Sequence, residues 1–158
     1  MRYKWVGLVA AWAILSCWLP LSRTLAIDPL SLLLLAPWHG SYMCNQGLTR
    51  LQLTLRRPAG GDESRIEADF VFSADPDNPS VPTGSFRMEG TVNRNDRTLA
   101  LKHIRWLEQP ADPSYKMVDL EGHFIFGDVQ AMIQGHITTY GCQDFALWQF
   151  FAMPEAVR

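Results

Sequence analysis

The sequence is poor in cysteine, in charge of one sign and in helical periodicity. Three of its 158 residues are cysteine, and its net charge is −2. Its basic residues are scattered and do not form the stripe that phosphate contacts require, so we expect no nucleic-acid partner. Its four histidines and three cysteines show no zinc-ligand spacing, so we expect no metal and no other cofactor.

The motifs of the common catalytic mechanisms are also missing. The chain has no Gly-x-Ser-x-Gly nucleophile elbow and no glycine-rich loop ahead of a helix that would hold a phosphate. Asp119 and Glu121 form a pair of carboxylates, but they alternate on the outer face of an expected strand. Acid–base catalysis needs a concave site that shifts pKa values, so this pair indicates solvent-exposed charge. The sequence therefore predicts that the protein is not an enzyme.

The first part of the chain is typical of exported proteins. Residues 5–22 carry no charge, basic residues precede them, and Thr24-Leu25-Ala26 offers small residues where a signal peptidase cleaves. We predict residues 1–26 to be a hydrophobic helix, either a cleaved signal peptide or a membrane anchor of the about 20 apolar residues that span a bilayer. A third interpretation is a lipoprotein acylated at Cys17, which follows a short lipobox-like sequence. Each interpretation places the rest of the chain in the periplasm or on the extracellular face of the cytoplasmic membrane.

Residues 27–37 form an apolar linker that is too short to cross a membrane. One interpretation is a short helix or strand that covers one end of the following domain. The other is a surface that contacts lipid or a membrane protein. A protein partner would then bind through Leu30, Leu32, Leu33, Leu34 and Leu35.

Two cysteines remain for the domain that we assign to residues 38–158. Because Cys17 lies in the leader, Cys44 and Cys142 form an even pair in an exported domain, where oxidation is the default. We predict a disulfide between them that links the first strand of the domain to the last. On the loop-entropy model such a bond stabilises by roughly 4–5 kcal/mol.

Between these cysteines the apolar residues mostly recur with the period of two that indicates β-strands. Short loops separate consecutive strands, and a proline-rich loop over residues 75–84 excludes a helix there. We predict an all-β domain of about seven or eight antiparallel strands that form a small closed or nearly closed barrel. A β-sandwich is the alternative, because the proline-rich loop could carry the chain between two sheets.

Two local predictions concern strand register. The apolar positions shift from Leu99 and Leu101 to Ile104 and Trp106, and a β-bulge near Lys102-His103 explains the shift. Farther along, Gly127-Asp128 suits a two-residue hairpin turn. This turn places Phe126 opposite Val129, and Asp119 opposite His136 on the outer face.

A set of short motifs resembles an uncharacterised exported β-domain of bacteria. The motifs are Trp38-x-Gly40-x-Tyr42-x-Cys44-x-Gln46-Gly47, Pro82-x-Gly84-x-Phe86-x-Met88-x-Gly90, Trp106 ahead of Gln109-Pro110, and Gly141-Cys142-x-x-Phe145-x-Leu147. The resemblance covers residues 38–147 and implies a fold and a compartment, but no activity.

Five residues are candidates for a binding surface, and each has a structural alternative. Trp38 and Tyr42 either stack on a ligand or pack around the disulfide. Trp106 either lines a cleft or plugs a barrel end, and Gln46 and Gln143 either bind a ligand or satisfy buried backbone groups.

The sequence favours a non-catalytic, exported or membrane-anchored β-module. Its role would be that of a protein-binding or accessory subunit of an envelope or membrane assembly. The alternative is a barrel that binds a small molecule or a glycan, since its aromatic residues suit such ligands. In that case Gly90, Gly122 and Gly135 would leave room inside the barrel.

Overall fold

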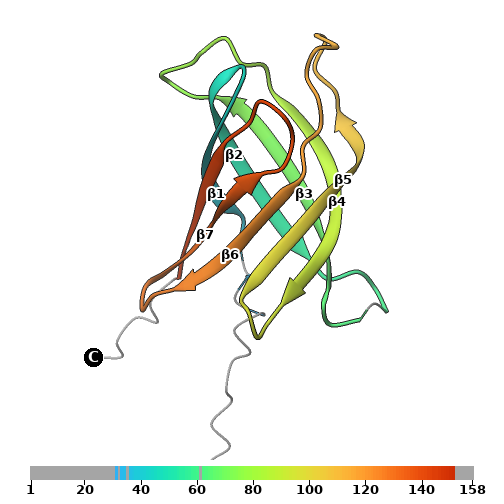
Figure 1. Cartoon of the computed structure of the whole chain (residues 1–158), viewed down its shortest axis with the longest axis vertical. Helices are drawn as coiled ribbons and strands as arrows, with labels where there is room; N and C mark the ends of the chain where they lie inside the picture. The colour runs from blue at the N-terminus through green and yellow to red at the C-terminus, as the bar shows by residue number, and fades with distance from the viewer. Residues whose placement is uncertain (1–30, 32, 35, 61, 152–158) are drawn as a thin grey trace, which may run out of the picture.

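The computed structural model describes residues 31, 33, 34, 36–60 and 62–151 (Figure 1). The expected N-terminal helix, Cys17 and the leucines 30, 32 and 35 lie outside these residues. Within the part of the chain that the structure describes, no helix is long and apolar enough to span a membrane.

Eight antiparallel strands follow one another around a closed barrel, so the barrel prediction is confirmed and the sandwich alternative is wrong. Each strand pairs with the next along the chain, and the last pairs with the first, with Gly40 opposite Leu147. The strands are β1 (Trp38–Cys44), β2 (Gly47–Arg56), β3 (Arg65–Ala74), β4 (Gly84–Asn93), β5 (Thr98–Glu108), β6 (Leu120–Phe126), β7 (Gln130–Ile137) and β8 (Asp144–Phe150).

The alternation of apolar and polar residues determines which side of each strand faces the interior. In β2 the three leucines 51, 53 and 55 are buried while their neighbours are partly exposed. In β3 the same holds for every second residue from Ile66 to Phe72. The inner faces predicted for these two strands are therefore confirmed.

Aromatic side chains fill the interior of the barrel. Phe70 from β3 stacks on Phe86 from β4 with ring centroids 4.4 Å apart. Tyr42 meets the edge of Phe70 at 5.6 Å, and Trp106 meets Phe86 at 5.5 Å. Rings packed in this way contribute more than their buried area alone, by about 0.5–1.5 kcal/mol per pair.

The glycines on the inner faces do not create space for a ligand. A Cβ atom on Gly90 would collide with the backbone carbonyl of Ala100, and one on Gly135 would collide with the carbonyl of Glu121. Gly135 lies opposite Gly122 on the neighbouring strand. These glycines allow neighbouring strands to approach closely, which corrects the expectation that they leave the interior open.

The bulge predicted in β5 is present, displaced slightly toward the end of the strand, and a second follows it. Pairing with β4 slips by one residue at Ile104 and again at Leu107. Trp106 therefore stays opposite Phe86 on the inner face. Ile104 is 49% exposed, so its predicted inner position is wrong, because it is itself the extra residue of the first bulge.

The predicted register of the β6–β7 hairpin is wrong by two residues. Phe126 pairs with Ala131, and the amide of Gly127 donates to the carbonyl of Gln130 at 2.9 Å. The two-residue turn is thus one position later than predicted, which leaves Val129 exposed in it. Because a shift by an even number preserves the faces, Phe124 still points inward, while Glu121 replaces Asp119 opposite His136.

One end of the barrel is closed by the segment that precedes β1. Leu33 is 2% exposed and Trp38 is fully buried, and the indole Nε1 of Trp38 donates to the carbonyl of Leu33 at 2.9 Å. The side-chain amide of Gln149 donates to the carbonyl of Ala36 and fastens the segment to β8. Leu33 therefore covers the end of the domain, and its predicted role in a partner contact is wrong because its side chain belongs to the core.

Candidate binding site at the mouth of the barrel

The two ends of the barrel differ in their loops. We call the end at which β1 begins the tether end and the end at which β1 finishes the mouth. The loops 75–83, 109–119 and 138–143 all lie at the mouth, together with the tight turn after β1 (Figure 1). Binding residues are commonly placed on loops that a rigid scaffold supports, so the mouth is the candidate site.

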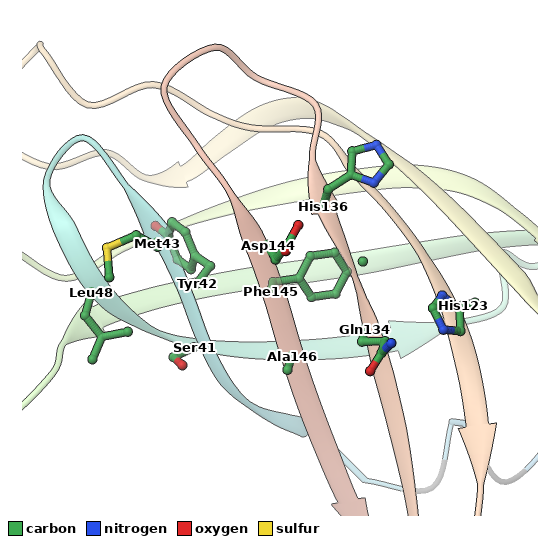
Figure 2. A pocket seen from close by; sticks show the side chains of 11 residues that line it. Ser41, Tyr42, Met43, Leu48, His123, Gln134, His136, Asp144, Phe145 and Ala146 are labelled. Carbon is green, nitrogen blue, oxygen red and sulfur yellow. The ribbon is translucent and has the colours of Figure 1, made fainter.

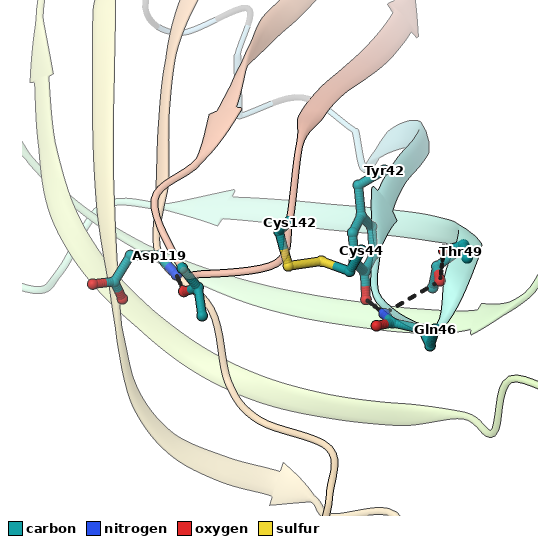
Figure 3. Close-up of a disulfide and its surroundings, with 8 residues drawn as sticks. Tyr42, Cys44, Gln46, Thr49, Asp119 and Cys142 are labelled. Carbon is teal, nitrogen blue, oxygen red and sulfur yellow. Dashed lines mark hydrogen bonds between the residues drawn. A yellow bond between two sulfur atoms is a disulfide. The ribbon is translucent and has the colours of Figure 1, made fainter.

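The predicted disulfide between Cys44 and Cys142 lies at the mouth (Figure 3). Cys44 ends β1, and Cys142 belongs to the loop that leads into β8. Beside the bond, the amide of Gln143 donates to the carbonyl of Met43 at 2.8 Å. The disulfide and this hydrogen bond fix the loop 138–143 against the first strand, beyond the last residues that pair in the β1–β8 ladder.

A buried tyrosine forms the floor of the mouth. Tyr42 is 4% exposed, and the side-chain amide of Gln46 lies 3.3 Å from its hydroxyl oxygen and 3.4 Å from the hydroxyl oxygen of Thr49 (Figure 3). Burial raises the pKa of Tyr42 well above its usual value, so the phenol stays protonated at physiological pH. The floor therefore presents a neutral hydroxyl group that is held in place by an amide.

Above this floor is a hollow of about 440 Å³ between the strands and the loops. Phe72 and Tyr115 line it as a parallel stacked pair with centroids 5.9 Å apart. Lys116 and Asp112 add charge, and the amide of Ser114 lowers the pKa of the Asp112 carboxyl. The hollow thus combines aromatic faces with groups that donate and accept hydrogen bonds.

The chemistry of the hollow suits binding. The sulfur atoms of Cys44 and Cys142 are bonded to each other, and the phenol of Tyr42 is held protonated, so none of the three supplies a nucleophile. Stacking on Tyr115 and hydrogen bonds to Gln46 are the interactions that the arrangement offers a ligand.

The structure brings together some of the sequence-predicted site residues and separates others. Tyr42 and Gln46 line the hollow. Gln143 is exposed on the adjacent loop. Trp106 is half-buried, and its ring centroid lies 6.4 Å from that of Phe72. Trp38 is fully buried at the tether end, so its predicted place in a binding surface is wrong: its ring packs on the core and its indole binds the linker.

Several residues of the site were missed by sequence reasoning. Tyr115 and Lys116 come from the segment 109–119, which sequence reasoning did not connect to a site. Tyr140 is 98% exposed at the rim of the hollow. Each of the loops 109–119 and 138–143 contains a tyrosine, and this was the signal that the sequence offered for a binding site. The alternating pattern of the strands does not show that these two loops lie at the same hollow.

A histidine–carboxylate pair lies where β5 leaves β6. His103 Nδ1 is 2.7 Å from Asp119 Oδ1, and the same oxygen accepts the backbone amide of His103 at 2.8 Å. Both side chains are partly exposed. β5 pairs with β6 only from Thr98 to Leu101, so the backbone amide of His103 lies beyond this ladder. The Asp119 carboxylate accepts the hydrogen bond of this amide in place of a carbonyl from β6.

A second, polar groove of about 510 Å³ crosses the outer face of the barrel (Figure 2). The small residues Ser41 and Ala146 lie side by side on β1 and β8 and line the groove. His136 borders it, 3.6 Å from Glu121. No group of three or more histidine, cysteine or acidic side chains among the described residues is arranged to hold a metal ion.

No family model matches this chain, and no curated protein matches it. The resemblance to an exported bacterial β-domain therefore stays a prediction.

Proposed function

We propose that this protein is a non-catalytic binding module, carried on an exported or membrane-anchored chain, that recognises a protein partner at the mouth of its barrel. The observation that carries the proposal is the position of the mouth. The linker leads into the tether end, whereas the two longest loops, 75–83 and 109–119, lie at the other end (Figure 1). The hollow lies at that end as well. A chain anchored through residues 5–22 would present the mouth away from the membrane.

Export is supported by two independent features. A small β-domain with a disulfide between Cys44 and Cys142 is compatible with an oxidising compartment. The uncharged run 5–22 and the basic residues before it have the order of a leader that directs the following domain outward. We propose the periplasm, or the extracellular face of the cytoplasmic membrane, as the location.

A protein partner is supported by the rim of the mouth. Tyr140 exposes 98% of its surface beside the disulfide, on a loop that is held in place. Exposed tyrosines on rigid supports are frequent anchors of protein interfaces, because they bury a large area at a small cost in conformational entropy. The interior, which aromatic rings fill, contributes rigidity to this surface.

The first test compares the two ends of the barrel. The tagged full chain is purified from detergent extracts as wild type, as Tyr140→Ala and as Phe150→Ala, and the proteins that copurify are quantified. Phe150 is 73% exposed at the tether end and is the matched aromatic control. We expect at least about a tenfold loss of the partner with Tyr140→Ala, as for a central interface tyrosine, and none with Phe150→Ala. Equal recovery with all three would contradict the proposal.

A glycan or another small molecule is the second candidate, and the hollow favours it. Its volume of about 440 Å³ falls in the range of about 300–1,000 Å³ found for ligand pockets. Calorimetric titration with soluble cell-wall glycan fragments tests this candidate. Binding that Tyr115→Ala abolishes would support it, whereas the absence of any heat signal would argue against it.

A further inference from the structure

The outer face formed by β6, β7, β8 and β1 changes from polar to apolar along the strands. Strand pairing arranges the outward residues in rows that run from one strand to the next. The row nearest the mouth contains Glu121, His136 and Asp144. The next row contains His123, Gln134, Ala146 and Ser41. The last full row contains Ile125, Met132, Trp148 and His39. Nearer still to the tether end, the exposed Gln130 pairs with Phe150.

Beyond this last row the strands end in further exposed apolar residues. Val129 in the β6–β7 turn is 47% exposed and Phe150 at the end of β8 is 73% exposed, next to Ile125 of the last full row, which is 40% exposed. The amide of Phe151 donates to the carbonyl of Val129 at 3.0 Å, which joins the turn to the end of β8. We call the group Ile125, Val129, Met132, Trp148 and Phe150 the apolar face.

The linker and the apolar face occupy the same end of the barrel. A hollow of about 510 Å³ is lined by Pro37 of the linker together with Trp148 and Phe150. The polar residues His39, Gln130 and Gln149 also line it. Leu33 is buried in the core, so the linker is fixed to this end from that residue onward. Between the uncharged run 5–22 and Leu33 there remain residues 23–32, which span at most about 35 Å when fully extended.

We propose that the apolar face lies against the surface of a lipid bilayer, at the boundary between headgroups and acyl chains. Aromatic residues such as Trp148 and Phe150 are suited to this boundary. The polar row that begins at His123 lies about 7 Å farther along the strands, since two residues of a strand rise by that distance. An interfacial element enters by about 5–10 Å, so the polar row stays at the level of headgroups and water.

The charges of this end limit how deep the barrel lies. Asp128 is at the tip of the β6–β7 turn, directly before Val129. A carboxylate loses too much hydration in the acyl region, so the turn stops among the headgroups. The barrel therefore rests on the bilayer through one side of its tether end, and its mouth is held at a defined tilt above the surface.

This inference uses the proposed anchoring of residues 5–22 but not the proposed binding at the mouth, so the two proposals can fail separately. A second copy of the chain is the competing occupant of an apolar face. The proximity of the linker favours lipid, because the anchor would hold this face next to the membrane in every molecule.

The test places a photoreactive group at each end of the full chain. Phe150→p-benzoylphenylalanine and Tyr140→p-benzoylphenylalanine variants are reconstituted in vesicles of phosphatidylethanolamine and phosphatidylglycerol at a ratio of about 3:1, floated and irradiated. Both positions are highly exposed, so the fold should accept either side chain. Val129→p-benzoylphenylalanine is the second probe of the apolar face. Mass spectrometry measures the yield of lipid adducts.

We expect the lipid-adduct yield at positions 150 and 129 to be at least about five times that at position 140. Similar yields at the two ends would overturn the proposal. So would an adduct between two copies of the chain in place of lipid, or protein that does not float with the vesicles. Loss of partner binding in Tyr140→Ala, by contrast, leaves this proposal unaffected.

Discussion

Removal of the disulfide should destabilise the barrel mainly by raising the conformational entropy of the unfolded chain. The change is the double variant Cys44→Ala/Cys142→Ala, which leaves no free thiol at either position. The β1–β8 ladder, from His39 to Tyr42, does not include these cysteines, so the variant keeps the pairing that closes the barrel. The folded state therefore loses one local link, while the unfolded state loses a constraint on most of the domain.

The expected size of the effect follows from the separation of the two cysteines. The bond joins residues 98 positions apart, and on the loop-entropy model closing such a loop contributes about 4.7 kcal/mol at 25 °C. A domain of this size is typically stable by about 5–15 kcal/mol, so the variant should lose a large part of its stability. Because the unlinked chain exposes more surface when unfolded, the dependence of the unfolding free energy on urea should also become steeper.

Urea titration followed by tryptophan fluorescence measures both quantities for the full chain in one detergent. Cys17→Ser is the control, since this cysteine lies in the predicted leader, and it should change neither quantity. We expect the double variant to lose about 3–5 kcal/mol and to show a larger slope. A loss below about 1 kcal/mol with an unchanged slope would refute the argument.

Three further predictions concern the strands. Phe70→Ala should lower the unfolding free energy by about 3–5 kcal/mol because loss of the fully buried ring leaves a cavity. The exposed control Phe150→Ala should lower it by less than about 1 kcal/mol. The same urea titration measures both variants, and equal losses would contradict the assignment of the core. Gly135→Ala should cost about 1–3 kcal/mol in thermal unfolding, and more than Gly127→Ala, whose new Cβ atom would meet only a carbonyl oxygen at 3.3 Å. Hydrogen bonds from Arg56 and Arg87 lower the pKa of Asp69 in the folded state. The contribution of this carboxylate to the free energy of unfolding is therefore complete above the pKa that Asp69 has in the unfolded chain. It is lost as the pH falls through the pKa that Asp69 has in the folded state. Asp69→Asn should therefore lose at most about 1 kcal/mol near pH 6 and match wild type once the pH lies below the folded-state pKa of Asp69. A difference that persists after the carboxyl is protonated in both states would contradict this.

Within the regular strands the sequence was sufficient to predict which residues face the interior, because period-two alternation depends only on each strand. Ile104 in a bulge and Val129 in a turn are the exceptions. Phe124 and Ile133 were placed on the inner face even though the register between their strands was wrong by two residues. A register shift by an even number of residues changes which residues pair across the strands, but it does not change which side chains face the interior. Barrel closure followed from the predicted disulfide, since Cys44 and Cys142 bring the first strand to the last.

The details that failed depend on interactions between segments. Val129 occupies the turn because Gly127 bonds to Gln130, a choice between adjacent two-residue turns that the local sequence does not decide. Ile104 is exposed because the first bulge of β5 falls on Ile104 itself and not at Lys102-His103. The hollow at the mouth was missed for the same reason: Tyr115 and Tyr140 come from different loops, and their proximity depends on where the strand ladders end.

The positions at which two strand ladders end explain why a hollow lies at the mouth of the barrel. The β1–β8 ladder ends at Tyr42, and the β5–β6 ladder ends at Leu101, on the far side of the barrel. Each gap is bridged by a different link: the Cys44–Cys142 disulfide on one side, and the Asp119 carboxylate that accepts the His103 amide on the other. The loops 138–143 and 109–119 leave the barrel at these two gaps and line the hollow between them. A disulfide does not open under oxidising conditions, whereas a partly exposed hydrogen bond exchanges with water. The wall of the hollow at the disulfide is therefore held by a covalent bond, and the wall beside β5 is held by hydrogen bonds of Asp119.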